Sequence, residues 1–205
     1  VLVSLFLVSA HGSTQPQDNQ IPGATYTNYR DRGGPWSIHI VRIDRSKPEF
    51  EIRSLHAEGR ALGLDTLSGQ LSDIKSVVGT PVAGINGDFF QRDRTFAGDP
   101  RGLQIIGGEL ISAPAGGTSF WIDTNGQPHI GRVVSRFRIV ATNGLFQSFG
   151  LNGQPNGRFL QLYTPMLGGS THTAGGRELV LESAAEPWAR FKMGQSYSAR
   201  VREVF

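Results

Sequence analysis

Short apolar segments separated by two-residue turn signals most constrain what this chain can fold into. The two clearest signals, with their flanking segments, are Gly107-Gly108 between 103–106 and 109–112, and Asn125-Gly126 between 119–123 and 127–132. Both dipeptides are typical of tight β-hairpins, whose turn positions need backbone angles that glycine and asparagine tolerate. Glycine contributes 27 of 205 residues, about twice its average share of roughly 7%. The pattern predicts a β-rich domain.

Further strands are expected wherever apolar residues alternate with polar ones. These segments are 36–44, 50–56, 137–142, 158–164, 177–182, 190–193 and 198–204. The first two flank a polar link, 45–48, and are predicted to form a hairpin. The last two are predicted to pair around Gly194-Gln195.

One segment has the spacing of a helix. Its apolar positions are Leu67, Leu71, Ile74, Val77 and Val78. Thr66 or Asp65 is suited to cap its start, and residues 79–81, Gly-Thr-Pro, are suited to end it. Since the order is strand, strand, helix, strand, we predict the α+β class, with mixed or antiparallel sheets, hairpins and at least one packed helix.

The first ten residues, 1–10, are apolar and uncharged but too short to span a bilayer. They resemble the hydrophobic part and small-residue cleavage site of a secretory signal, although a core strand is an alternative. We therefore predict a partial signal segment at 1–10, a flexible linker at 11–23 and one domain at 24–205. Both ends look cut. The mature protein is expected to be secreted, periplasmic or in the cell envelope, with no membrane span.

Composition and missing motifs exclude several classes of function. The formal net charge is only +3 and scattered, which argues against nucleic-acid binding. Because cysteine is absent, disulfides, thiol nucleophiles, cysteine-based zinc sites and lipoprotein anchors are excluded. The histidines lack metal-binding spacing, and nucleophile-elbow, dinucleotide-binding and P-loop motifs are absent. We expect no cofactor.

The strongest candidate site is the stretch 81–90, P-V-A-G-I-N-G-D-F-F. Its apolar run predicts a buried strand, which stops at a turn-forming Asn-Gly-Asp. A turn after a buried strand holds polar groups still, so Asn86 and Asp88 are the predicted catalytic residues. The alternative is that both side chains only cap the turn, and that Phe89 and Phe90 belong to the core.

The following loop, 91–100, mixes acids and arginines, and Arg101 comes directly after it. Arginine grips phosphate through two parallel hydrogen bonds, so the loop is suited to an anionic substrate. For Arg92 and Arg94, weak surface ion pairs are the simpler interpretation. A further alternative for the function of this region is a metal-dependent hydrolase that binds a divalent cation through Asp88, Asp93 and Asp99. His172 lies in a glycine-rich turn, where it lines a pocket or simply faces solvent.

Several segments together resemble the phosphodiester glycosidase family, which includes bacterial exopolysaccharide-biosynthesis proteins. They are A-G-I-N-G-D-F-F, P-R-G-L-Q-I-I-G-G-E-L-I-S, W-I-D-T-N-G-Q-P-H-I-G, L-Q-L-Y-T-P and T-H-T-A-G-G-R-E-L-V-L. The resemblance covers roughly 36–182. It implies a secreted hydrolase that cleaves the bond between a sugar's anomeric carbon and a phosphodiester. The residues matching the family signature are Asn86, Gly87, Phe89 and Phe90, whereas Asp88 replaces a residue that is often small in the family.

For this activity the substrate-binding residues are predicted to be Gly87, Phe90, Arg101 and Gly102, and the partner a carbohydrate or glycosyl phosphate. Family members carry a later Asp-Gly-Gly-Gly-Ser-like motif that we do not find; Gly168-Gly169-Ser170 lacks the preceding aspartate. We therefore expect the domain to be incomplete at its C-terminal end and the chain alone to be inactive. A non-catalytic carbohydrate-binding or cell-envelope module of the same fold is the alternative function.

Overall fold

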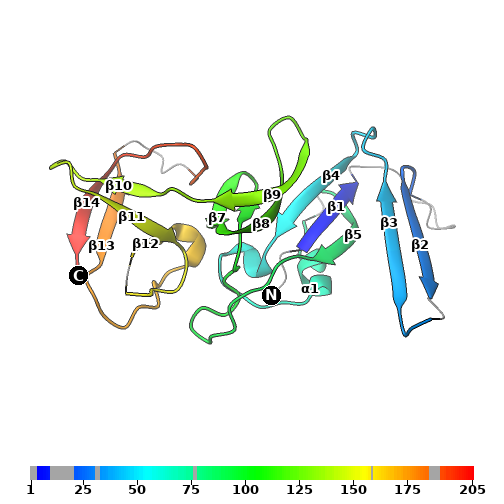
Figure 1. The fold of residues 1–205 in the computed structure, drawn as a ribbon, viewed down its shortest axis with the longest axis horizontal. Helices are drawn as coiled ribbons and strands as arrows, with labels where there is room; N and C mark the ends of the chain where they lie inside the picture. Colours follow the sequence, from blue (N-terminus) through cyan, green and yellow to red (C-terminus); the bar gives the residue numbers. More distant parts are fainter. Residues whose placement is uncertain (1–3, 10–20, 31–32, 76–77, 158, 185–189) are drawn as a thin grey trace.

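The computed structural model describes residues 4–9, 21–30, 33–75, 78–157, 159–184 and 190–205. Over the described residues the fold is all-β, with 42% in strands and 7% in helices. The predicted α+β class is therefore wrong, because within these ranges no helix reaches seven residues. Figure 1 shows several small sheets along the molecule, with the β2–β3 hairpin at one end and the β13–β14 pair at the other.

One three-stranded sheet holds the segment predicted to carry the site. Its order is β4 (Phe50–Leu55), β1 (Ser4–Ser9) and β5 (Thr80–Asn86), and both pairings are antiparallel. Strand β1 falls within the signal-like segment; residues 1–3 and 10 of that segment, and 11–20 of the predicted linker, lie outside the described ranges. The signal function stays a prediction, because strand pairing does not test export.

Strand β5 is less buried than its apolar run predicts. It lies at an edge of its sheet, and the side chain of Ile85 is 61% exposed. On one face, the terminal methyl groups of Leu67 and Leu71 approach Gly84 so closely that a Cβ there would lie 3.1 Å from each. The missing side chain at Gly84 therefore lets helix α1 (Leu67–Ser72) lie against the strand.

Helix α1 begins as predicted but ends early. The Thr66 hydroxyl accepts a hydrogen bond from the Gly69 amide at 3.0 Å, which is an N-cap. At the other end, the amide of Ile74 donates to the carbonyl of Leu71, three residues earlier. This 3₁₀-type spacing tightens the last turn. The helix is six residues long, and residues 76–77 of the predicted helix lie outside the described ranges. No described helix combines the length and the apolar character needed to cross a membrane.

The predicted pairing of 36–44 with 50–56 is wrong, although both strands form. Strand β3 (Ser37–Ile43) pairs with β2 (Ala24–Arg30), a strand that we did not predict, and β4 pairs with β1. The link after β3 is fixed locally, since the Asp44 carboxylate accepts from both the amide and the hydroxyl of Ser46. It carries the chain from one sheet to another.

Both hairpins with two-residue turn signals are confirmed. Strands β6 (Gln104–Ile106) and β7 (Glu109–Ser112) pair around Gly107 and Gly108, whose φ angles are 55° and 80°. Strands β8 (Ala115–Ile122) and β9 (Pro128–Val134) form the second hairpin. Positive φ at the turn is what the glycines supply.

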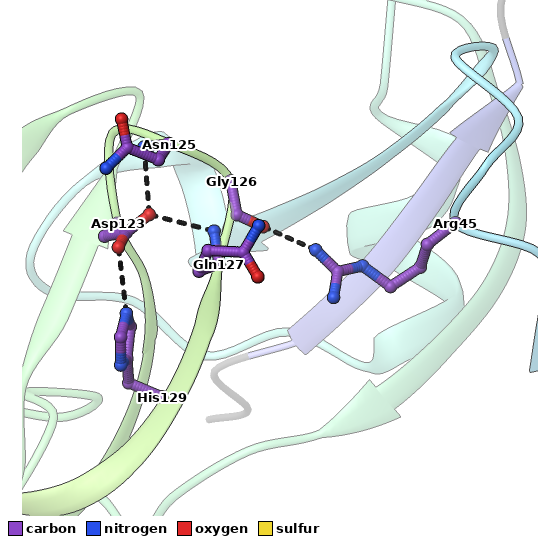
Figure 2. Close-up of polar contacts among 6 residues, drawn as sticks. All are labelled: Arg45, Asp123, Asn125, Gly126, Gln127 and His129. Carbon is purple, nitrogen blue, oxygen red and sulfur yellow. Dashed lines mark hydrogen bonds and ion pairs between the residues drawn. The ribbon is translucent and has the colours of Figure 1, made fainter.

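The turn of the β8–β9 hairpin is organised by the carboxylate of Asp123 (Figure 2). It accepts hydrogen bonds from the amides of Asn125 and Gln127 and pairs with the ring of His129 at 2.9 Å. These donors hold the pKa of Asp123 below its usual value, the His129 hydrogen bond having the largest effect. Arg45 donates to the carbonyl of Gly126, so the β3–β4 link is tied to this turn.

The C-terminal part contains a three-stranded sheet and a strand pair. The sheet consists of β10 (Arg138–Val140), β11 (Phe146–Leu151) and β12 (Leu160–Leu162), with β11 and β12 parallel. Strand β14 (Ala199–Val204) pairs with β13 (Leu179–Ser183), so the predicted pairing of 190–193 with 198–204 is wrong. Instead, the Phe191 carbonyl accepts from the Leu110 amide of β7.

The core is formed by loops, single turns and strand β7 rather than by the centre of one large sheet. Ala61, Phe96, Ile111 and Leu167 form its fully buried cluster. Leu167 belongs to a short 3₁₀ turn, η2 (Pro165–Leu167), and a similar turn, η1 (Ala57–Gly59), precedes Ala61. Segments far apart in the sequence therefore meet at this cluster, and both pockets described below adjoin it through the loop that carries Phe96.

Candidate functional site

The end of β5 places the predicted catalytic residues at the surface. Asn86 is the last residue of the strand and is exposed. Asp88 bends back onto the backbone, where its Oδ1 accepts from the Phe89 amide at 2.7 Å. Its Oδ2 lies against Gly102, since a Cβ at that glycine would lie 2.3 Å from the oxygen. The structure thus brings Asp88 and Gly102 together, and any side chain at position 102 would displace the carboxylate.

The loop after β5 is closed by a short antiparallel ladder. The Arg101 amide donates to the Phe89 carbonyl at 3.0 Å, and the Gln91 amide donates to the Asp99 carbonyl at 2.8 Å. Phe90 and Pro100 form the bridge between these two bonds. Phe96 is buried in the core cluster, so the loop between the two strands of the ladder is held at its tip as well as at its base.

A pocket of about 370 Å³ opens beside this ladder. We call it the β5-end pocket; its lining residues are Phe89, Phe90, Gln91, Arg92, Asp93 and Arg101. Two of the predicted substrate-binding residues, Phe90 and Arg101, therefore meet, whereas Gly87 and Gly102 do not line the pocket and neither do Asn86 and Asp88.

Of the two arginines that line this pocket, Arg101 is oriented before any ligand binds. Nη2 of Arg101 donates to Oε1 of Gln91 at 2.9 Å, and Nε2 of Gln91 donates to Oε1 of Gln154 at 2.9 Å. Phe89, by contrast, is 79% exposed, so one ring is open to solvent at the edge of the pocket. The pocket thus combines a fixed cation with free aromatic surface.

Asp99, which the sequence offered as a candidate cation ligand, has a perturbed pKa in the structure. It is half-buried, and burial raises the pKa of its carboxyl to about 7. The carboxylate lies beside Gly153, where a Cβ would be 3.5 Å from Oδ2. Perturbed carboxyl groups next to a pocket are frequent in active sites. Sequence reasoning recognised the charge of Asp99 but had no signal for its burial.

Two further groups near Asp99 have perturbed pKa values. Burial, with smaller effects from Glu178 and Asp99, raises the pKa of Tyr163, whose hydroxyl is buried and has no hydrogen-bond partner among the described residues. Burial also lowers the pKa of His56, whose Nε2 lies 2.8 Å from the Gly98 carbonyl. This contact ties His56 to the loop after β5 at Gly98.

The acids of the divalent-cation alternative are used separately. Asp88 accepts from the Phe89 amide, Asp93 accepts from the Thr95 amide at 2.8 Å, and Asp99 lies beside Gly153. Among the described residues, no three acidic or histidine side chains are arranged to hold a metal ion. The geometry of the site gives this alternative no support.

Comparisons of the chain with protein-family models, with curated proteins and with solved structures find no match. The resemblance to phosphodiester glycosidases therefore stays a prediction from the motifs. What the molecule itself offers is the β5-end pocket, with two aromatic rings, two arginines and one carboxylate at its wall.

Proposed function

We propose that this protein hydrolyses a sugar-1-phosphodiester bound at the β5-end pocket. The observation that supports this most is the lining of the pocket, where Phe89 and Phe90 lie next to Arg92 and Arg101. A glycosyl phosphate has an apolar sugar face joined to an anion. Aromatic rings suit the first part and guanidinium groups suit the second.

The arginines are proposed to bind the phosphodiester and the rings the sugar. Because Gln91 already orients Arg101, little side-chain entropy is lost when the anion binds. The exposed ring of Phe89 offers a flat surface beside it. Asn86, at the end of β5, is proposed to hydrogen-bond sugar hydroxyls through its exposed amide.

In the proposed reaction, water attacks the anomeric carbon and the bond from that carbon to the phosphate oxygen breaks. The electron pair leaves with the phosphate, so the products are a free sugar and a phosphate monoester. Glycoside hydrolysis generally uses two carboxyl groups. A phosphate is already a good leaving group, so two requirements remain. One is negative charge near the positive sugar carbon, for which Asp93 at the pocket wall is the candidate. The other is hydrogen-bond donors on the leaving oxygen.

Sugar release from a synthetic sugar-1-phosphodiester tests this proposal, with the protein produced from the complete reading frame that contains the chain. Asn86→Ala is expected to lower kcat/KM by on the order of a hundredfold, because hydrogen bonds to sugar hydroxyls strengthen in the transition state. Asn125→Ala, at the β8–β9 turn, is the matched control and is expected to keep full activity. Equal rates for both variants would contradict the assignment of Asn86.

A non-catalytic carbohydrate-binding module is the second candidate. The observation that favours it is that Asp93 is the single carboxylate lining the pocket among the described residues. In that case, titration with a sugar-1-phosphate is expected to shift the NMR signals of Phe89, Phe90 and Arg101 until binding is saturated. The complete protein is then expected to release no sugar. Turnover that depends on Asn86 excludes this candidate.

A further inference from the structure

A second pocket shares a wall with the β5-end pocket. Its volume is about 220 Å³, and we name it the Arg60–Arg94 pocket. The residues on which the argument rests are Glu58, Arg60, Arg94, Thr95, Leu167 and His172. The wall is the loop after β5: Arg92 and Asp93 line the first pocket, whereas Arg94 and Thr95 line the second.

Three segments of the chain build this pocket and are tied together. The Ala61 amide donates to the Met166 carbonyl at 2.7 Å, and the Gly63 amide donates to the Ala97 carbonyl at 3.0 Å. Leu167, which lines the pocket, is also a member of the buried core cluster. The floor of the pocket is therefore part of the buried core, and the polar residues around it belong to segments that backbone hydrogen bonds hold together.

The charges around the pocket are mainly positive. Neither Arg60 nor Arg94 forms an ion pair with any residue in the described ranges. Nη1 of Arg60 reaches the neighbouring glycine turn, where a Cβ at Gly168 would lie 3.9 Å away. Glu58 is the one carboxylate in the lining, so two guanidinium groups face a single acid.

The backbone beside the pocket is unusual in two places. In the part of the chain that the structure describes, three non-glycine residues have positive φ: Glu58 at 57°, Asn152 at 51° and His172 at 56°. Asn152 is accounted for by its buried hydrogen bonds to Ile111 and Thr164. Glu58 and His172 both border the pocket, and such conformations gather at ligand-binding sites. The ring of His172 is held by an edge contact with Phe96, at a centroid distance of 6.0 Å.

We propose that the Arg60–Arg94 pocket binds a phosphate-class anion. Two guanidinium groups can each offer parallel donors to a tetrahedral oxyanion, and the hydroxyl of Thr95 adds a further donor. The pocket admits a small group over an apolar floor. This site is separate from the β5-end pocket and does not depend on the proposed hydrolysis.

Titration with inorganic phosphate tests the proposal, using the complete protein in phosphate-free buffer at constant ionic strength and following NMR signals of the pocket residues. Saturable binding is expected. Arg60→Ala and Arg94→Ala are each expected to weaken it by about tenfold or more, since hydrogen bonds between charged groups are stronger than those between neutral groups. Both arginines are exposed, so the variants are expected to keep the wild-type thermal unfolding midpoint.

Arg138→Ala is the matched control, because this exposed arginine of β10 lines neither pocket; it is expected to leave phosphate affinity unchanged. Acetate is expected to bind more weakly than phosphate when the two are compared at the same total concentration of anionic charge. The proposal is overturned if phosphate does not saturate, if acetate binds equally well, or if Arg92→Ala and Arg101→Ala reduce the affinity while Arg60→Ala does not. The last result would place the anion in the β5-end pocket.

Discussion

Asp99 shows how one buried carboxyl group can control a response to pH. Burial raises its pKa from an ordinary value of 3.8 to about 7. In the interval between these values, the folded protein keeps a proton that the unfolded chain releases. The free energy of unfolding therefore falls as pH rises through this interval, and this group has no further effect above it.

We expect Asp99→Asn to remove this fall. The variant should be more stable than the wild type above the interval, because no buried group has to ionise. Urea unfolding at pH values on either side of the interval measures the difference. Because the buried His56 has a lowered pKa, its contribution to the free energy of unfolding decreases as pH falls. The wild type and the variant are therefore compared with each other at each pH, which cancels this contribution. Parallel pH profiles for the two proteins would contradict the role of Asp99.

At this scale the sequence predicted which residues carry charge and which turns they occupy, but not which of them are buried. Phe90 and Arg101 were assigned to one site and do line one pocket. Arg60 received no assignment, because its partners in space, Arg94 and His172, lie 34 and more than 100 positions further along the chain. No periodicity or motif connects residues at such separations.

Among the elements, the contact between α1 and β5 depends on a missing side chain. We expect Gly84→Val to destabilise the protein by about 1–3 kcal/mol, because the added methyl groups enter the space of Leu67 and Leu71. Gly117→Val is the control, since nothing lies within 4 Å of a Cβ at that exposed position of β8. Chemical denaturation of both variants measures the difference, and equal losses would show that strand propensity rather than the helix contact decides the effect.

Elements with local partners were predicted and elements with distant partners were not. The hairpins β6–β7 and β8–β9 follow from two-residue turns, whose conformation is set by the glycines at the turn itself. The sheet β4-β1-β5 joins segments from three separate parts of the chain, and nothing local in their sequences indicates this order. The short α1 likewise reflects its tight last turn, which apolar spacing does not predict.

For the molecule as a whole, we expect the buried cluster of Ala61, Phe96, Ile111 and Leu167 to contribute most to stability. Leu167→Ala is expected to cost about 2–5 kcal/mol, the usual range for emptying a buried leucine site. Leu179→Ala, at a position 52% exposed, is the control and should cost far less. Thermal unfolding distinguishes them; similar midpoints for both variants would mean that the cluster does not hold the molecule together.

The division into sheets of two or three strands has a consequence for behaviour in concentrated solution. In the described ranges, every strand except β1 and β11 lies at the edge of its sheet. Edge strands leave backbone donors and acceptors that water satisfies and that another polypeptide can recruit. On β14 all six residues are exposed, and Arg200, Arg202 and Glu203 place charge along it. Hydration of these charged side chains at such margins favours colloidal dispersion over strand-by-strand aggregation.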